Sequence, residues 1–202
     1  RHRGANTRPP GPALWRYGRL QIGRFFHHSS LPCSTRRASR ASVVSTSDRG
    51  SAMDYMQLAI EQAQAAAEQG EVPVGAVLVG PNGEVLASAQ NQMRSQNDPT
   101  AHAEMSVIRE ACAKLSQERL LECDLYVTLE PCPMCAGAIA HARIRRLYYG
   151  ASDRKGGAVD NGVALFAQDT CHHAPEVIGG LREAECAALL KGFFALRRNE
   201  PV

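Results

Sequence analysis

The sequence predicts an α/β protein, in which helices cover a β-sheet. Helix-like and strand-like segments follow one another in the order α-β-β-α-β-α-β, with a last helix near the C-terminus, which is typical of this class. Residues 72–80 are continuously apolar, as a strand buried on both faces should be. With 202 residues, the chain is long enough for one compact domain plus an appendage.

The first elements of the domain form a helix and a hairpin. Residues 54–69, "DYMQLAIEQAQAAAEQ", carry apolar side chains at helical spacing, and Gly70 is a stop signal. The segment "VPVGAVLVG" (72–80) is a strand, "PNG" (81–83) is a turn and "EVLASAQN" (84–91) is a second strand. Two strands joined by a short turn predict a β-hairpin.

The second half of the domain alternates between helix and strand. Asp98 and Pro99 are suited to be the cap and the first-turn residue of the next helix. The predicted segments are a polar loop at 92–99, a helix at about 100–114, a strand at 124–130, a helix at 133–143, a strand at 144–150, a Gly-rich loop at 153–164 and an amphipathic helix at 182–198.

Charge divides the chain into two regions. Residues 1–50 contain ten arginines and one acid, Asp48, for a net charge of +9, whereas residues 51–202 contain 13 basic and 19 acidic residues, for −6. The first region is Arg- and Ser-rich without hydrophobic periodicity, so we predict a disordered extension. It represents either a misassigned start, the true start lying near Met53, or an organelle transit peptide, and a nucleic-acid-binding arm is a third interpretation.

The cysteines and the hydropathy predict the cellular location of the protein. Seven cysteines, an odd number with irregular spacing, predict a reducing compartment without a disulfide framework. No apolar run approaches the roughly 20 residues needed to span a bilayer. We therefore predict a cytoplasmic protein without a membrane partner, or an organellar one if residues 1–50 are a transit peptide.

The segment "LEPCPMCAGAI" (129–139) carries the first candidate site. Cys132 and Cys135 lie three residues apart at the start of a predicted helix, where free N–H groups and the helix dipole favour thiolates. Such a pair serves equally in thiol oxidoreductases, in structural metal sites and in catalytic zinc sites. The pair alone leaves these three alternatives open.

The segment "NDPTAHAEM" (97–105) favours the catalytic alternative. His102 would be a third zinc ligand, and no fourth strong ligand is evident, which leaves the open position typical of catalytic zinc. Glu104 can face the same metal if the helix begins there, and a carboxylate beside the metal can move protons. His-X-Glu followed about thirty residues later by Pro-Cys-X-X-Cys is the signature of zinc nucleobase deaminases.

Four segments resemble the bacterial tRNA-specific adenosine deaminases. They are "PVGAVLV" (73–79), "NDPTAHAEM" (97–105), "LYVTLEPCPMCAGAI" (125–139) and "ECAALLKGFF" (185–194), and the resemblance covers about residues 54–198. It implies the cytidine-deaminase-like three-layer α/β/α fold, with a central mixed sheet of about five strands and helices on both faces. It also implies a homodimeric hydrolase with one zinc ion per subunit, which deaminates the wobble adenosine of a tRNA anticodon to inosine. Residues 51–202 would form this deaminase domain.

The resemblance also implies the functional residues. They are the zinc ligands His102, Cys132 and Cys135, the proton shuttle Glu104, the base contact Asn91, and the anticodon-loop contacts Asp153 and Lys155. Two stretches depart from the family: "DTCHHAPE" (169–176), and the loop 153–164, which is unusually polar and Gly-rich.

Two other functions compete with this one. A deaminase of a free base or nucleotide, such as guanine, cytosine or deoxycytidylate, would share the zinc residues and Glu104. A silent zinc scaffold or RNA-binding module would have no need of an acid beside an open metal position. RNA binding normally requires a basic surface, so in this acidic domain we expect either that Lys and Arg gather on one face, or that binding depends on the zinc ion and on a groove built by the dimer, to which the basic extension could contribute. We also expect at least one ring of Phe193 and Phe194 to pack in the core, and Arg143, Arg145 and Arg146 to form a solvated run.

Overall fold

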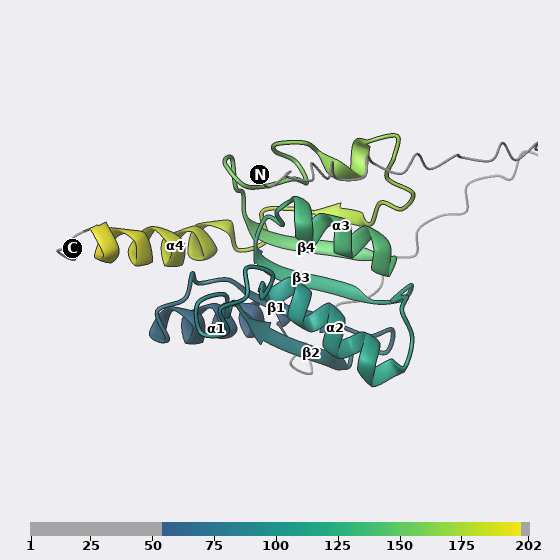
Figure 1. The fold of residues 1–202 in the computed structure, drawn as a ribbon, viewed down its shortest axis with the longest axis horizontal. Helices are drawn as coiled ribbons and strands as arrows, with labels where there is room; N and C mark the ends of the chain where they lie inside the picture. The colour runs from purple at the N-terminus through teal and green to yellow at the C-terminus, as the bar shows by residue number, and fades with distance from the viewer. Residues whose placement is uncertain (1–53, 199–202) are drawn as a thin grey trace, which may run out of the picture. The chain divides into compact units, whose positions relative to one another are not determined.

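The computed structural model describes residues 54–198, and the predicted extension at 1–50 lies outside this range. The described part consists of helices and strands in alternation (Figure 1). In chain order they are α1 (Tyr55–Glu68), β1 (Gly75–Val79), β2 (Val85–Gln90), α2 (Ala103–Leu115), β3 (Asp124–Leu129), α3 (Pro133–Ala142), β4 (Arg146–Ala151), the 3-10 helix η1 (Leu165–Ala167), β5 (Glu176–Ile178) and α4 (Glu183–Arg198). None of these helices is long and apolar enough to cross a membrane.

The five strands form one mixed sheet in the order β2-β1-β3-β4-β5. The predicted hairpin is present, since β1 pairs antiparallel with β2. Strand β1 is also antiparallel to β3, whereas β3, β4 and β5 are parallel to one another. The parallel pairing requires crossovers, and α3 provides the one between β3 and β4.

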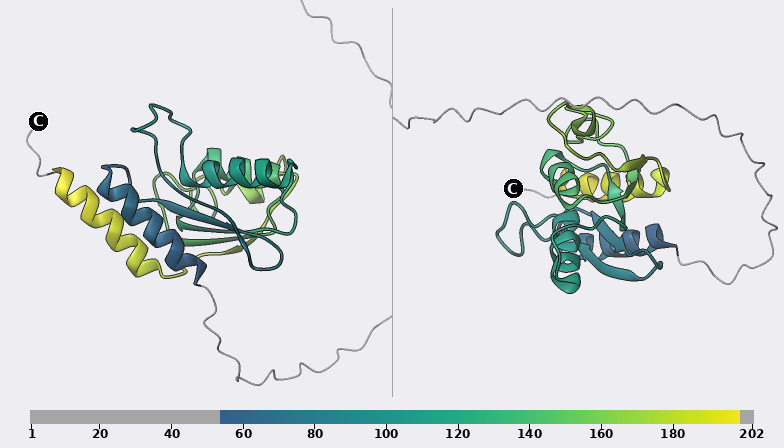
Figure 2. Two further views of the ribbon diagram at one scale, coloured as in Figure 1. Left: turned by 90° about the horizontal axis from the view of Figure 1, so that it is seen from below. Right: turned by 90° about the vertical axis from the view of Figure 1, so that its right-hand side faces the viewer.

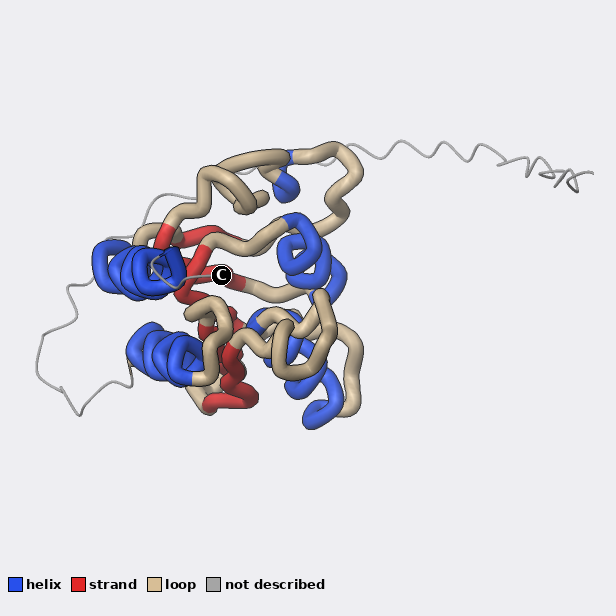
Figure 3. Tube along the Cα trace, turned by 60° about the vertical axis from the view of Figure 1, so that its left-hand side comes forward, coloured by secondary structure: helices blue, strands red, loops and turns tan. Residues whose placement is uncertain are grey.

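Alternation along the central strands creates two hydrophobic cores. Ala76 and Leu78 of β1 face a core shared with α2 and α3, whereas Val77 and Val79 of the same strand face a core shared with α1 and α4. Every residue of β1 is buried, which explains its continuously apolar sequence. Helices α1 and α4 therefore cover one face of the sheet, and α2 and α3 cover the other (Figures 2 and 3). The predicted three-layer α/β/α architecture is confirmed.

The structure corrects the prediction at the start of α2. We expected this helix to begin near Thr100 with Asp98 as its cap, but His102 is the N-cap residue. Asp98 instead forms a local turn, in which its Oδ1 atom accepts hydrogen bonds from the backbone N–H and the hydroxyl of Thr100. An Asx-type turn and a helix cap use the same side chain, and sequence alone does not separate them.

The last helix differs from the expectation as well. Helix α4 contributes Cys186 to the buried core, but its distal half extends away from the sheet (Figure 1). The ring of Phe193 is only partly buried and packs edge-on against Phe194, which is 45% exposed. The expectation that one of these rings packs into the core is wrong, because the helix runs past the sheet it would pack against.

Candidate active site

Two helices begin at the edge of the sheet where β3 ends. Strand β3 ends at Leu129, and the chain enters α3 through Cys132, the N-cap residue of that helix. His102 is the N-cap residue of α2. Pro133, at the first position of α3, has the fixed φ that suits a helix start. The two helix N-termini thus bring the His102 and Cys132 side chains together from segments thirty residues apart.

The ligand atoms of His102, Cys132 and Cys135 lie within 4.8 Å of one another. The Nδ1 atom of His102 is 3.7 Å from the Sγ atom of Cys132 and 3.4 Å from that of Cys135. Tetrahedral zinc, with Zn–S and Zn–N bonds of about 2.3 and 2.0–2.1 Å, places S and N ligands about 3.5 Å apart. The residues therefore fit a zinc ion, and they form the only such group among the residues that the structure describes.

The thiols and the imidazole influence one another's protonation. The hydrogen bond between the two cysteines is the main cause that lowers the pKa of Cys132, to about 4, and His102 contributes in the same direction. The same hydrogen bond, together with burial, raises the pKa of Cys135. The pKa of His102 is raised, mainly by its hydrogen bond to Cys132. The lowered pKa of Cys132 favours its thiolate, the form in which cysteine binds metals.

Glu104 is the buried acid of this site. Its side chain is only 3% exposed, and its Oε2 atom has no hydrogen-bond partner among the described residues. Burial raises the pKa of this carboxyl, although the nearby His102 opposes the shift. A buried polar atom without a partner costs about 1–3 kcal/mol, and such atoms are rare outside functional sites. The carboxyl is therefore placed to exchange protons with a bound reactant.

A cavity of about 190 Å³ opens beside these residues. Its walls include His102, Glu104, Cys132, Asn91 and Asp153. Pockets for drug-sized ligands usually measure about 300–1,000 Å³. The cavity is thus sized for a flat ring such as a single base rather than for a whole nucleotide.

A second, wider cavity of about 690 Å³ adjoins the first. Both are lined by Asp153 and Gly156, where they meet. The remaining lining of the wider cavity consists of Lys155, Phe194, Arg197 and Arg198, which include three cations and an exposed aromatic ring. Three cations therefore lie beside the inner cavity, and whether they serve RNA binding stays a prediction.

The structure places the three predicted substrate contacts in different ways. Asn91 is buried (4% exposed) and lines the inner cavity, as does Asp153. Lys155 lines only the wider cavity, so it can reach parts of a substrate that remain outside the inner one. These placements agree with the predicted roles in position, and the roles themselves stay predictions.

Two buried carboxylates at this site were missed by the sequence analysis. Glu71 is 1% exposed and accepts hydrogen bonds from the side-chain amide of Asn91 and from the backbone N–H groups of Arg94 and Ser95. Glu130 is 2% exposed and accepts hydrogen bonds from the loop that carries Asp153. The only signal in the sequence is an acid next to a strand end, which is too common to indicate either contact.

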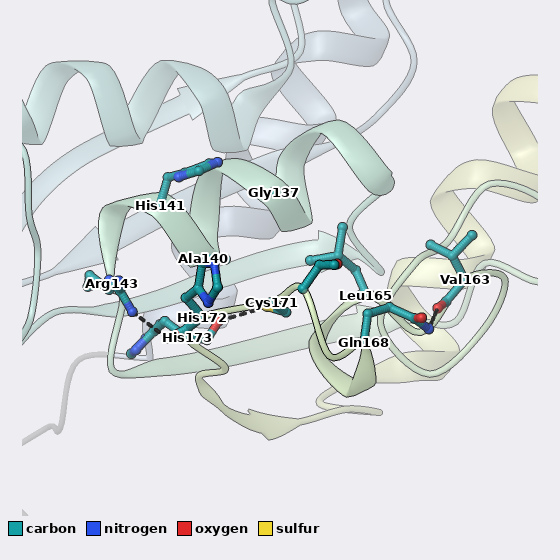
Figure 4. A pocket seen from close by; sticks show the side chains of 11 residues that line it. Gly137, Ala140, His141, Arg143, Val163, Leu165, Gln168, Cys171, His172 and His173 are labelled. Carbon is teal, nitrogen blue, oxygen red and sulfur yellow. Dashed lines mark hydrogen bonds between the residues drawn. The ribbon is translucent and has the colours of Figure 1, made fainter. Parts of the chain in front are cut away.

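Another cavity, of about 270 Å³, lies at the far end of α3 (Figure 4). The three described histidines outside the zinc site, His141, His172 and His173, all line it, but their ring nitrogens form no metal-binding group. Arg143 donates a hydrogen bond to the backbone carbonyl of His172, and His173 Nε2 lies 2.7 Å from the carbonyl oxygen of Ile144. These side chains hold the loop against the helix, away from the catalytic cavity.

The neighbouring Arg145 and Arg146 form ion pairs while 38% and 40% of their side-chain surface stays exposed. Arg145 forms two hydrogen bonds with the carboxylate of Asp124, at 2.8 and 2.9 Å. Arg146 pairs with Glu176 at 2.6 Å, which joins β4 to β5. The run therefore stays partly exposed to solvent, as expected, and these two arginines also pair with neighbouring acids.

Known proteins resemble both the sequence and the structure. The sequence model of the cytidine and deoxycytidylate deaminase zinc-binding region matches residues 50–151. A tRNA-specific adenosine deaminase of Agrobacterium fabrum is 60% identical over 144 residues, which cover 71% of this chain and 94% of that protein.

Solved structures give the same picture. One from biochemical and structural studies of A-to-I editing by tRNA:A34 deaminases at the wobble position of transfer RNA superposes with a TM-score of 0.66 and 61% identity, covering 67% of this chain and 98% of that one. A guanine deaminase from Nitrosomonas europaea superposes with a TM-score of 0.61 at 23% identity, covering 70% of this chain and 83% of its own, and shares the fold alone.

Proposed function

Because the chain belongs to the cytidine and deoxycytidylate deaminase family, and within it to the tRNA-specific adenosine deaminases, we propose that it hydrolyses the wobble adenosine of a tRNA anticodon to inosine. The reaction consumes water and releases ammonia from C6 of the base. Residues 51–202 are the proposed catalytic domain.

The shape of the site is the observation that carries this proposal. The inner cavity has room for one base, and it opens into a wider cavity lined by Lys155, Arg197 and Arg198. An enzyme that acts on a base within a polynucleotide must extract that base from its neighbours and hold it in a small pocket. The phosphates and flanking nucleotides remain outside, where cations and aromatic rings bind them. A free base would need no such outer surface.

His102, Cys132 and Cys135 are the residues that would hold the zinc ion, and three protein ligands are the number typical of catalytic zinc. When bound, zinc would supply the Lewis acidity that activates water as a nucleophile at neutral pH. The other steps belong to protein groups.

Glu104 is the proposed proton carrier. Its buried carboxylate accepts a proton from the attacking water and delivers it to N1 of the ring; it then takes the second proton from the new hydroxyl on C6 and passes it to the amino group, which leaves as ammonia while the C6 carbonyl forms. Its Oε2 atom has no partner among the described residues, so it can make these exchanges without breaking an existing hydrogen bond. The raised pKa of the carboxyl favours its role as an acid in the second half of the cycle.

Other residues of the two cavities are proposed to position the substrate. Asn91 and Asp153 line the inner cavity and are proposed to contact the base and its sugar. Lys155 and Arg198 in the wider cavity are proposed to contact phosphates of the anticodon loop, and Phe194 offers a ring for stacking on a neighbouring base.

The assembly and location are proposed as well. We propose a homodimer, as the family resemblance implies, with the outward side of α3 as the contact face. That helix contains no charged residue, and a side chain added at Gly137 would meet nothing within 4 Å. The mass of the protein in solution, measured by light scattering, tests this. We also propose a cytoplasmic location, in agreement with the free cysteines among the described residues.

The test of the proposed reaction determines at which position of the tRNA inosine is formed. The zinc-loaded full chain is incubated with a complete tRNA that carries adenosine at the wobble position, and inosine is located by reverse transcription, which reads it as guanosine. Conversion at the wobble position alone, with the other loop adenosines as internal controls, is the expected result. Conversion at several adenosines, or at none, would overturn the assignment.

A further inference from the structure

We propose that Glu130 is a positioning residue, whose carboxylate holds the loop 152–161 in the shape that forms one wall of the catalytic cavity. The inference rests on the proposed function, because it concerns the same site. Glu130 follows β3 directly and lines the inner cavity together with Asp153 and Gly156.

The hydrogen bonds that the Glu130 carboxylate accepts all come from this loop. Its Oε1 atom accepts three consecutive backbone N–H groups, those of Val159, Asp160 and Asn161, at 2.9–3.1 Å. Its Oε2 atom accepts the backbone N–H of Asp153 at 2.9 Å and the side-chain amide of Asn161 at 2.6 Å. The Ser152 hydroxyl adds a longer contact of 3.4 Å. One carboxylate thus ties both ends of the loop to the end of β3.

The loop is built to close over this carboxylate. A Cβ atom at Gly157 would lie 2.5 Å from the carboxyl carbon of Glu130 and 2.5 Å from the carbonyl oxygen of Asp153, so only glycine allows the approach. Gly162, at the end of the loop, has a φ of +56°, and a Cβ there would meet the Gly157 carbonyl at 2.3 Å. The Gly-rich sequence of this segment therefore serves the packing of the loop around Glu130.

Glu130 also fixes Asp153, and Asp153 in turn fixes its neighbours in the loop. The backbone N–H of Asp153 is fixed by Glu130, and the Oδ1 atom of Asp153 in turn accepts hydrogen bonds from the N–H groups of Lys155 and Gly156, each at 3.0 Å. Asp153 and Gly156 line both cavities, and Lys155 lines the wider one. Loss of the anchor would therefore displace the boundary between the two cavities.

A comparison of two acids in one cavity separates positioning from catalysis. A carboxylate has about four lone-pair sites, and Glu130 already receives six donors, so it has none left for a substrate. Glu104 lines the same cavity, and its Oε2 atom has no hydrogen-bond partner within residues 54–198. Glu130 thus acts through the loop, whereas Glu104 is free to act on the reactant.

Glu130→Gln tests the inference. It keeps the size of the side chain but replaces one accepting oxygen by an NH₂ group, which cannot accept the hydrogen bonds that the loop donates. We expect one zinc per chain as before, faster amide hydrogen exchange at residues 153 and 159–161, and a KM for the tRNA at least tenfold higher with a smaller change in kcat. Asn161→Ala removes one of the donors to Glu130 and should change the same quantities less.

Asp124→Asn is the matched control. It makes the same carboxylate-to-amide change at the opposite end of β3, where Asp124 pairs with Arg145. It should lower stability without changing the exchange of the loop or the KM. Unchanged exchange and KM in folded Glu130→Gln would overturn the inference, and if that variant does not fold, unchanged values in Asn161→Ala would do so. A wild-type enzyme that forms no inosine contradicts the proposed function instead, while the exchange of the loop still decides the anchoring.

Discussion

Replacement of Glu104 by glutamine should stop turnover while the fold and the metal site remain. Glutamine has the same shape, so the cavity keeps its size, but it cannot accept a proton from water at neutral pH. General acid–base groups typically contribute about 10²–10⁴-fold, and we expect kcat to fall by this factor, or about 3–5.5 kcal/mol of transition-state stabilisation.

The stability of the fold should stay the same or increase in this variant. Glu104 is 3% exposed, and burial raises its pKa, which means that the folded state disfavours its charge. An amide removes this cost, so the melting temperature of Glu104→Gln should equal or exceed that of the wild type.

The assay compares three proteins. Inosine formation, zinc content and melting temperature are measured for the wild type, for Glu104→Gln and for Glu110→Gln, a control on the exposed side of the same helix. The control should behave as the wild type does. A Glu104→Gln enzyme with near-native turnover would refute the role of this acid, and loss of zinc in this variant would show that Glu104 supports the metal site instead.

Three further predictions concern Cys135, the cations of the wider cavity and Cys186. Cys135→Ala removes a buried residue that we propose as a zinc ligand, so zinc measured by atomic absorption should fall well below one equivalent and inosine formation should cease; retained zinc would contradict the proposed ligand set. Combined substitution Lys155→Ala and Arg198→Ala should weaken tRNA binding and reduce the slope of log K against log salt by about 1.4, whereas Lys191→Ala, elsewhere on α4, should leave the slope unchanged. Burial raises the pKa of the Cys186 thiol to about 11, so this thiol stays protonated in the fold where the unfolded chain ionises. Its contribution to stability is therefore intact below pH about 9 and is lost as the pH rises toward 11, and Cys186→Ala should flatten the pH dependence of the unfolding free energy in this range.

The metal site could be predicted from the sequence because its geometry is local. Cys132 and Cys135 are fixed by one helix start, and His102 by another, so residue type and spacing already specify three ligands. The hairpin could be predicted for the same reason, since a short turn between two apolar strands fixes its pairing.

The missed elements depend on tertiary contacts. Strand β5 has only three residues, and it is defined by its parallel pairing with β4, which the Glu176–Arg146 ion pair accompanies. The helix η1 directly follows the predicted loop 153–164, in a stretch for which we predicted no element, and its N-cap residue Ala164 has a positive φ that an alanine does not indicate in the sequence. Neither element has enough residues to carry a periodic signal.

The role of Glu130 also could not have been read from the sequence. Its partners lie 22–31 residues away, and they are mostly backbone N–H groups, which have no signature in the sequence. The glycines that permit the approach were noted as a departure from the related enzymes. Their reason became visible only when the loop was seen to close over a carboxylate.

The most direct test of the central claim compares substrates of different size. The zinc-loaded protein is incubated with an anticodon stem-loop that carries adenosine at the wobble position and, in parallel, with free cytosine, guanine and deoxycytidylate. The continuous inner and outer cavities predict inosine in the RNA and no turnover of the small molecules. Turnover of a small molecule without inosine in the RNA would leave the zinc chemistry in place but contradict the role of the outer cavity as an RNA-binding surface.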